Sequence, residues 1–570
     1  MRTKIVLLLL ILLAITVIIG RYTPEINQLL NKKTIFTQLF NDPISDSRES
    51  SFRSPYKTQP LEYLYVTIME KDPVYGYTFD DLNKLNQVIS QSQEPQMSIL
   101  LQTGTENGPD LLETEKNTNS HPSISNATIE IRGNTTRNSE QKSYKIRIMD
   151  QNNSIWNNQL TINLNKHPYD YIHVRNKLSF DYMKLIPDLT SLETQFVRVF
   201  IKDQTSNPND QDYIDYGLFT HVEQLNKRHL ENKGMDPDAY LYKAINFEFY
   251  TYPEAFRERD DPFYDKTAFE KHLSIRGREY HAKLIDMLED VNNPSLSIES
   301  YFDKHFNRDN FLTFIGVNIL MGNLDTSSNN FFIYSSVYSE QWYFLPWDYD
   351  GAWDYHYAWG RNGLSVHPYR EGLSLYLGWP LARKFFQDPK NVNALSEKIE
   401  SLSKIITEER TKDFLESYYP IVKPLLMSEP DVVRLPRNIE SFDENYYSIV
   451  SLPTNNRERY YRNLAKPAPI FIGDPWIEGG KITFNWTESF DMQNDEIFYD
   501  FKVSKSPDFS SIYMEVTNLT RLDIVSDIMP PGEYFWTVTI RDINGNEQIP
   551  FETYMDSGKY YHGVKRFIVE

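Results

Sequence analysis

A concentrated set of acidic and amide side chains marks the stretch GNLDTSSNNFFIYSSVYSEQWYFLPWDYDGAW. It carries Asp325, Asn330, Asp348 and Asp350, and it contains neither histidine nor cysteine. Carboxylates gathered this closely repel one another unless a cation compensates them. Oxygen ligands alone favour a hard ion such as Mg²⁺ or Mn²⁺ over zinc. The residue types therefore predict a metal site with Asp348 as its main ligand and with Asn330 and Asp350 as further candidates.

The spacing of these residues predicts that a β-hairpin brings them together. NFFIYSSV and QWYFLPW read as strands on either side of a short polar break. Positions equidistant from the turn face each other in an antiparallel pair, so a turn centred on Ser339 places Asn330 beside Asp348. A turn one residue shorter would place Asn329 there instead. The alternative is a surface turn that is simply capped by Asp and Asn side chains.

The same residues follow an order that is used for phosphoryl transfer. Protein kinases place a catalytic Asp five residues before a metal-binding Asn, and a second metal-binding Asp follows after a short hairpin. Asp325, Asn330 and Asp348 reproduce this order, without the usual His-Arg before the first and Phe-Gly after the last. The order predicts Asp325 as the catalytic base or phosphate-positioning residue.

A nucleotide site also needs a cation for the phosphates. In QKSYKIRI, period-two alternation puts Lys142 on the strand face of Tyr144, while Lys145 points the other way. An inward lysine is costly unless an anion meets it, so Lys142 is the predicted catalytic and phosphate-binding lysine. Lys145 is the alternative phosphate-binding lysine. Lys142 could also have no functional role and simply be an edge-strand lysine whose amino group reaches into water. Arg132 and the loop Gly133–Thr136 are further candidates to cover the phosphates.

Two aromatic residues are candidates for the walls of an adenine site. Trp347 directly precedes Asp348, and Tyr242 lies in the segment LYK. Large rings offer flat apolar faces for stacking, but both residues could equally belong to the core.

The order of patterns along the chain predicts an α+β body followed by an all-β module. Strand patterns lie at 61–69, 97–105, 127–150 and 196–225, and helical patterns follow at 311–324 and 381–464. Strands early and helices late suggest two lobes. Beyond KPAPIF, short alternating runs continue to the end of the chain. Trp486, the pair Tyr534-x-Trp536 and a closing Asp-x-x-Gly turn resemble a fibronectin type III domain, and the strand spacing suits a β-sandwich.

Composition narrows the classes of partner. The 570 residues include 79 acidic and 59 basic side chains, a formal charge of −20, which disfavours nucleic acid as a partner. The chain has no cysteine, so disulfides and thiolate chemistry are excluded. The N-terminal MRTKIVLLLLILLAITVIIGRY predicts a membrane anchor with the body outside, or a cleaved signal segment. The predicted divisions are 1–22 (anchor), 23–60 (stalk), 61–464 (body) and 465–570 (sandwich).

Four segments, in order, resemble the spore coat protein H (CotH) kinase family: IRGNTTRNSEQKSYKIRI, YGLFTHVEQLNKRHL, LYK and PWDYDGAW. The resemblance covers about 61–464. It implies a two-lobed, atypical protein-kinase-like fold that uses ATP and a divalent metal to phosphorylate Ser residues. Glu223 matches the family pattern Gly-x-Tyr-x-x-x-Glu, with Phe219 replacing the Tyr, and is therefore expected to pair with the lysine or to contact the nucleotide. Asp350 also fits a family position.

One departure from the family pattern bears on the metal geometry. Where the family often has His and Asn between the first acid and the strand, this chain has Ser327, Ser328 and Asn329.

The sequence thus predicts an extracytoplasmic kinase that transfers phosphoryl groups from ATP to Ser/Thr hydroxyls of a surface or coat protein. Its negative charge favours a basic, Ser-rich acceptor. The leading alternative is a non-catalytic adhesion or assembly protein with a structural cation site. A polysaccharide-processing enzyme is a third possibility, because acids and aromatic residues also build sugar clefts.

Overall fold

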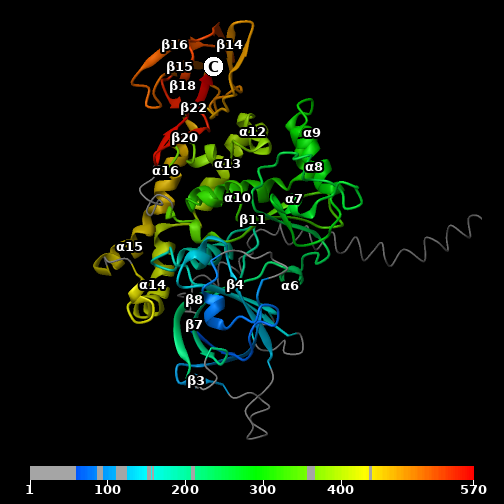
Figure 1. Ribbon diagram of the computed structural model, residues 1–570, viewed down its shortest axis with the longest axis vertical. Helices are drawn as coiled ribbons and strands as arrows, with labels where there is room; N and C mark the ends of the chain where they lie inside the picture. The colour runs from blue at the N-terminus through cyan, green and yellow to red at the C-terminus, as the bar shows by residue number, and fades with distance from the viewer. Residues whose placement is uncertain are drawn as a thin grey trace, which may run out of the picture.

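The protein is arranged in three layers along its longest axis. The computed structural model describes residues 60–86, 94–110, 125–149, 156, 159–206, 212–355, 366–435 and 439–570. In this part of the chain, an N-terminal sheet lies at one end, a helix-rich centre follows, and a β-rich C-terminal region lies at the other end (Figure 1). Mixed helices and strands with a β-rich end confirm the predicted α+β class.

The predicted anchor at 1–22 lies outside the described residues, as does nearly all of the predicted stalk. Within the described ranges, no helix combines the length and the apolar character needed to cross a membrane.

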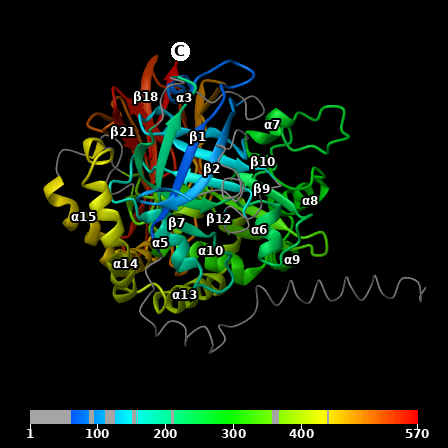
Figure 2. The same ribbon diagram turned by 90° about the horizontal axis from the view of Figure 1, so that it is seen from below.

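The N-terminal layer is one sheet that closes on itself. Its strands, in spatial order, are β1 (Glu62–Ile68), β7 (Thr194–Asp203), β8 (Ile214–Glu223), β6 (Thr161–Asn165), β5 (Ser143–Ile148), β4 (Ala127–Arg132), β2 (Met97–Thr105) and β3 (Gly108–Pro109). β1 pairs in parallel with β7 and antiparallel with β2, which completes the ring. Figure 2 views β1, β2 and β7 from below. The strand patterns predicted from the sequence are all present.

Alternation along these strands separates two faces with different roles. The enclosed face carries apolar side chains such as Leu64, Ile129 and Tyr144, which pack into one buried cluster. The short helix α3 (Phe79–Asn83) adds Phe79 and Leu82 to this cluster, and Thr78 caps its N-terminus. Residues that alternate with the enclosed ones point outward, and those of β4 and β5 become important below.

The central layer contains a second, four-stranded antiparallel sheet. Its spatial order is β10 (Leu273–Ile275), β9 (Tyr240–Ala244), β11 (Phe331–Ser335) and β12 (Tyr343–Pro346). Helix α10 (Arg308–Leu320) packs against β12 and is buried from Asn310 to Leu320. An apolar sequence on every side explains why α10 lies inside the core and why it ends beside the first acid of the site.

Further helices surround this sheet and α10. They are α5 (Arg175–Met183), α6 (Lys227–Asn232), α7 (Lys266–Glu270), α8 (Ala282–Asn292), α9 (Ile298–His305), α12 (Pro380–Phe386), α13 (Pro389–Ser403), α14 (Glu408–Leu426), α15 (Phe442–Ser448) and α16 (Leu452–Leu464). Helices α12 to α16 occupy the stretch in which the sequence predicted helices, and α10 packs directly on α13 and α16. Together they enclose the largest apolar cluster of the protein.

The C-terminal layer has its own core between two sheets. One sheet contains β13 (Trp476–Glu478), β14 (Lys481–Asn485) and β17 (Asp523–Asp527), and the other contains β16 (Ile512–Leu519), β15 (Ile497–Ser504), β18 (Gly532–Asp542), β19 (Glu547–Gln548) and β22 (Lys565–Val569). Trp486, Tyr534 and Trp536 are buried between them. The Tyr534 hydroxyl donates to the carbonyl of Pro530 at 2.9 Å, a tyrosine corner of the kind found in immunoglobulin-like sandwiches.

The sandwich and the body share a packed joint. Phe490 and Met492 of the sandwich pack against the core of the body. The guanidinium of Arg383 in α12 donates to the carbonyl of Pro469 at 2.8 Å and to that of Glu488. The hairpin of β20 (Thr553–Asp556) and β21 (Lys559–His562) extends from the sandwich toward the body (Figure 1).

Candidate active site

The first acid of the site is positioned by the end of α10. Asp325 lies in the 3₁₀ turn Leu324–Ser327, one short turn beyond the helix. The Asn323 side chain accepts a hydrogen bond from the backbone N–H of Asp325 at 3.2 Å and so caps this turn. The hydroxyl of Thr326 contacts that of Tyr376 at 2.7 Å, which fixes the turn against the core.

The second and third acids follow β12 directly. Asp348 begins, and Asp350 lies within, the 3₁₀ turn Tyr349–Gly351, in which Tyr349 is fully buried against Phe180. Asp348 adopts φ +56°, the left-handed conformation that few residues other than Gly, Asn and Asp accept readily. The buried tyrosine between them holds the turn, and both acids remain half-buried.

The three acids form one electrostatic group. Burial raises the pKa of Asp350, and the charges of Asp348 and Asp325 raise it further. Gly351 shows how closely the two turns approach, because a Cβ at this position would overlap the Asp325 carboxylate. The glycine of the PWDYDGAW segment is therefore what lets Asp325 reach the turn of Asp348 and Asp350.

The predicted hairpin is present, but its register differs by one residue. β11 pairs with β12 so that Phe331 faces Pro346, and the next step places Asn330 opposite Trp347. The Trp347 N–H accordingly donates to the Asn330 carbonyl at 3.3 Å. The same register extended once more puts Asn329 opposite Asp348, which is the shorter-turn alternative. Asn330 has φ +58°, so two left-handed residues, Asn330 and Asp348, flank the end of the ladder.

Two basic side chains neighbour the acids. Arg132 ends β4 and Lys243 lies in β9, so the two come from different sheets. Burial lowers the pKa of Arg132, and Asp348 and Asp350 oppose this effect. Burial also lowers the pKa of Lys243 to about 8, again opposed by Asp348. The acid group thus faces a positive pair contributed by both layers.

Trp347 packs against both of these cations. The Arg132 guanidinium carbon is 5.6 Å from the centre of its ring, and the Lys243 amino nitrogen is 5.4 Å away. Phe332 packs edge-on at 5.5 Å, and the tryptophan is only 3% exposed. Its π-face therefore helps to hold the cations in place. An adenine would meet Trp347 only at the small part of the ring that these neighbours leave uncovered.

A family-wide sequence profile described as CotH kinase protein matches residues 129–461, more than half of the chain. The matched segment contains Arg132, Lys243 and the three acids, and it ends within α16. The chain belongs to the CotH kinase protein family.

Two individual proteins are similar to this CotH-family chain. Inner spore coat protein H of Bacillus subtilis (strain 168) is 23% identical over 338 residues, which covers 59% of this chain and 86% of the relative. A solved HipA–HipB–operator DNA complex from Shewanella oneidensis MR-1 matches 66% of each chain at 11% identity, with a TM-score of 0.21. A similarity that weak carries no argument about fold or function.

Lys142 is not among the residues that meet the acids of this CotH-family site. As predicted, it shares the face of Tyr144, but that face is the enclosed one of the closed sheet. Its amino group donates to Asn86 Oδ1 at 3.0 Å and to the carbonyls of Leu85 and Arg137. These oxygens, and not an anionic ligand, compensate the inward lysine.

The alternative lysine lies on the outward face. Lys145 is 3.4 Å from Glu130, and its charge contributes to lowering the pKa of Lys243. Glu130 also pairs with Arg147 at 2.8 Å. Arg132, Glu130 and Lys145 alternate with the enclosed residues of β4 and β5, so one sheet face supplies them all.

Glu223 and Tyr242 are placed away from their expected partners. Glu223 is buried at the end of β8, where it contacts His229 at 3.0 Å and accepts from the Glu193 N–H at 3.1 Å. Burial opposes ionisation, but the hydrogen bond and charge of His229 outweigh it and lower the pKa of Glu223. The hydroxyl of Tyr242 lies 2.9 Å from His281 Nδ1, inside the core. Glu223 therefore fixes α6, and Tyr242 is a core residue.

Sequence reasoning missed two site residues. Lys243 follows Tyr242 in the segment LYK, and alternation along β9 alone puts it on the opposite, site-facing side. His167 follows β6, and its Nδ1 lies 3.6 Å from Asp350 Oδ2. His167 has a left-handed backbone, with φ +50°. No local sequence pattern predicts its contact with Asp350, because that contact depends on the path of the loop after β6.

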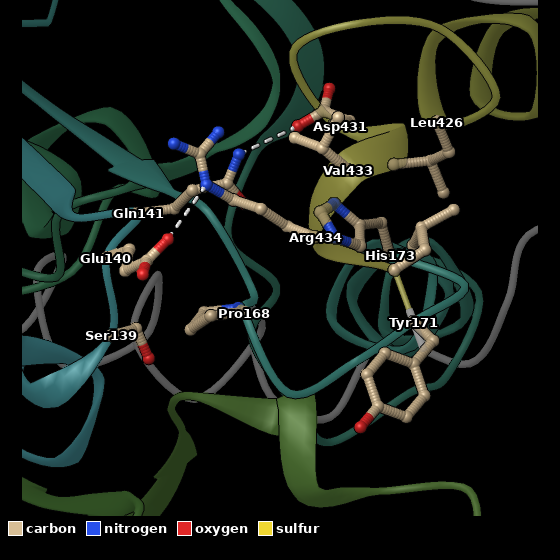
Figure 3. A pocket seen from close by; sticks show the side chains of 11 residues that line it. Ser139, Glu140, Gln141, Pro168, Tyr171, His173, Leu426, Asp431, Val433 and Arg434 are labelled. Carbon is tan, nitrogen blue, oxygen red and sulfur yellow. Dashed lines mark hydrogen bonds and ion pairs between the residues drawn. The ribbon is translucent and has the colours of Figure 1, made fainter. Parts of the chain in front are cut away.

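A cavity of about 280 Å³ lies next to this loop (Figure 3). Its lining includes Gln141, Tyr171, His173, Asp431 and Arg434, but none of the three acids. The ring of His173, which lines the cavity, is 6.1 Å from that of His167, the neighbour of Asp350. The cavity neighbours the acid group without being part of it.

Proposed function

We propose that this protein is a metal-dependent kinase that transfers the γ-phosphoryl group of ATP to Ser or Thr hydroxyls of a protein. The observation that carries the proposal is the grouping of Asp325, Asp348 and Asp350 against Arg132 and Lys243. Phosphoryl transfer requires acidic side chains that bind a metal ion and, beside them, basic side chains that bind the phosphates.

The acids fit a hard divalent metal. Asp348 and Asp350, with amide oxygen from Asn330 or Asn329, offer the oxygen ligands that Mg²⁺ or Mn²⁺ prefers. Burial raises the pKa of Asp350, and the charges of Asp348 and Asp325 raise it further, so a cation bound among these acids would offset their mutual repulsion. When bound, such an ion supplies charge neutralisation for the triphosphate.

The basic residues would hold the nucleotide. We assign phosphate contacts to Arg132 and Lys243, with Lys145 as a third candidate, in place of Lys142. Lys243 replaces the lysine predicted from sequence because its charge faces Asp348, while the Lys142 amino group is already bound by carbonyl oxygens. Trp347 would contribute by holding Arg132 and Lys243, and Glu223 and Tyr242 would support the fold around the site.

Asp325 is the proposed base or positioning residue. In the transfer step, the acceptor hydroxyl oxygen forms a bond to the γ-phosphorus while the bond to the ADP oxygen breaks. The hydroxyl proton passes to the Asp325 carboxylate and then to water. Gly351 supports this role because it allows Asp325 to lie beside the other two acids.

Several broader features belong to the same proposal. The closed sheet and the helix-rich centre would serve as the two lobes of a kinase-like body at 61–464, with the sandwich at 465–570 as an attached module. We propose an extracytoplasmic location through the N-terminal segment, either anchored or secreted. A charge of −20 supports a basic, Ser-rich acceptor and gives no support to a nucleic-acid partner.

A transfer assay tests the proposal. The full chain is incubated with γ-labelled ATP, Mn²⁺ or Mg²⁺, and a basic Ser-rich protein, and the assay is repeated with Asp348→Asn. Label should enter the acceptor with the wild type and fall at least about 100-fold in the variant. Asp286→Asn, an exposed acid on α8, is the matched control and should retain activity. Absence of transfer and of nucleotide binding in the wild type would exclude the kinase.

A non-catalytic assembly role is the second candidate. The Bacillus subtilis relative is described as an inner spore coat protein, a name that indicates a structural setting for that protein. A cation bound by the same acids without any nucleotide affinity would favour this candidate.

A further inference from the structure

Three aspartates of the C-terminal sandwich form a second acidic group. Asp491 and Asp495 lie in the loop between β14 and β15, and Asp542 ends β18. One carboxylate oxygen from each lies within 4.8 Å of the corresponding oxygens of the other two. Oxygens that share one Ca²⁺ at about 2.3–2.6 Å can stand up to about 5 Å apart. The three carboxylates are therefore close enough to bind the same ion.

One oxygen of this group is buried without a partner. Asp491 is 8% exposed, and its Oδ1 accepts from the N–H groups of Gln493 at 2.7 Å and Asp495 at 3.1 Å. Its Oδ2 is shielded from water and accepts no hydrogen bond from the described residues. A buried carboxylate oxygen left unsatisfied is costly, and a cation is the partner that its charge requires.

Protein cations do not fill this role. Within the described ranges, no ion pair joins Asp491, Asp495 or Asp542 to a lysine or arginine. Asp542 is fully buried, and its carboxylate accepts from the backbone N–H and the side-chain amide of Asn546, while Asp495 accepts from Asn544 at 2.7 Å. Burial and the charges of its two neighbours raise the pKa of Asp491.

The loop that carries Asp491 is also part of the joint with the body. Phe490 and Met492, on either side of Asp491, pack against the core of the body. The carbonyl of Glu488 accepts from Arg383 of α12. The acidic group is thus located where the orientation of the sandwich on the body is set.

We propose that Asp491, Asp495 and Asp542 bind a Ca²⁺ ion that fixes this loop, and with it the sandwich, on the body. Three carboxylates without histidine or cysteine select a hard ion. Ca²⁺ fits better than Mg²⁺ because it accepts more oxygen ligands in a flexible geometry, and a loop offers carbonyl oxygens beside its side chains. The site is separate from the acids of the proposed active site.

Calcium titration of the full chain tests this inference. The protein carries Asp348→Asn, which removes the main ligand of the first acidic group, and it is stripped with a chelator before calorimetry. It should bind Ca²⁺ with a Kd of about 1 mM or tighter, and saturation should raise the apparent Tm by roughly 4 °C. Adding Asp495→Asn should weaken binding at least about tenfold.

The matched control is Asp523→Asn, which removes the same charge from an exposed position on β17 of the sandwich. It should bind Ca²⁺ as the parent does. Asp491→Asn provides a second variant if Asp495→Asn fails to fold. The inference is overturned if the parent binds no Ca²⁺ at millimolar concentration, or if Asp495→Asn and Asp491→Asn bind it unchanged.

Discussion

At the scale of single residues, Lys243 makes the proposed nucleotide site sensitive to pH. Its pKa of about 8 in the folded protein lies below the ordinary value of 10.5, mainly because of burial. If its charge binds phosphate, nucleotide affinity should fall as pH rises through about 8. Binding of MgATP measured by calorimetry from pH 7 to 9.5 should show this decrease, and Lys243→Met should remove it.

The same residue has an opposite effect on stability. Between pH 8 and 10.5 the unfolded chain holds the Lys243 proton and the folded chain does not, so the contribution of this residue to stability rises with pH. Unfolding by denaturant should show this rise in the wild type and a smaller one in Lys243→Met. Lys271→Met, an exposed lysine at the end of α7, is the control. Equal pH profiles for all three proteins would contradict the assignment.

Gly351 is predicted to be essential for the close approach of the turn that carries Asp325 to the turn that carries Asp348 and Asp350. Gly351→Ala places a methyl group against the Asp325 carboxylate, so phosphoryl transfer should fall at least about tenfold while Tm changes little. Gly378→Ala is a matched control, because its Cβ would meet only Phe551 at 4.0 Å. Comparable kcat/KM values for the two variants would show that phosphoryl transfer does not depend on the close contact between Asp325 and residue 351.

At the scale of elements, α16 holds the loop that follows the acids. Arg459 contacts the buried Asp354 at 2.9 Å, and burial raises the pKa of Asp354. Arg459→Met leaves this carboxylate buried without its cation, which costs about 3 kcal/mol when it is ionised. A carboxyl group whose pKa is raised by folding makes the protein less stable as pH rises above the pKa of the unfolded chain. The stability lost in Arg459→Met should therefore be larger at pH 7 than at pH 4.

Denaturant unfolding at the two pH values measures this difference. Arg462 is an exposed arginine on the same helix that pairs with Glu458 at 3.9 Å, and Arg462→Met should show little change at either pH. A loss that is the same at pH 4 and pH 7 would mean that the charge of Asp354 is not involved.

The closed sheet gives Lys142 a structural role. Its amino group ties β5 to the carbonyls of Leu85 and Arg137 and to Asn86, near α3. Lys142→Met should therefore lower Tm while leaving nucleotide affinity within about twofold, since the site-facing cations are unchanged. A variant with a native Tm and no nucleotide binding would restore the role predicted from the sequence.

Local patterns predicted the elements well and the faces only in part. Alternation correctly placed Lys142 and Lys145 on opposite faces of the sheet. Which face is enclosed, and which meets the acids, depends on the closure of the sheet through the pairing of β1 with both β2 and β7. These are contacts between distant strands, which no local pattern encodes. The register of the hairpin could not be predicted by assuming a turn centred on one residue. The residues between Ser335 and Tyr343 lie outside the β11–β12 ladder, and their conformation sets the register.

At the scale of the whole molecule, the sandwich is fixed to the body through Arg383. Arg383→Met removes the contacts to the carbonyls of Pro469 and Glu488, so limited proteolysis should cleave the segment 465–495 faster than in the wild type. Lys384→Met is the control, because Lys384 donates to the carbonyl of Asn293 within the body. Equal cleavage rates would show that apolar packing alone holds the joint.

The sequence predicted a boundary between the body and the sandwich at residues 464 and 465, and the packing joins the two parts across it. Phe490 and Met492 belong to the sandwich by sequence, yet they pack against the core of the body. A boundary inferred from the shift at KPAPIF marks a change of architecture. It does not mark an end of contact, because the joint is formed by residues that lie beyond it.

The most direct test of the central claim is a crystal structure with Mn²⁺ and a non-hydrolysable ATP analogue. The proposed site predicts an anomalous manganese peak within about 2.3 Å of an Asp348 oxygen, with the phosphates near Arg132 and Lys243. A nucleotide bound elsewhere, or manganese that ignores Asp348 while the nucleotide is present, would contradict the assignment of these acids to phosphoryl transfer.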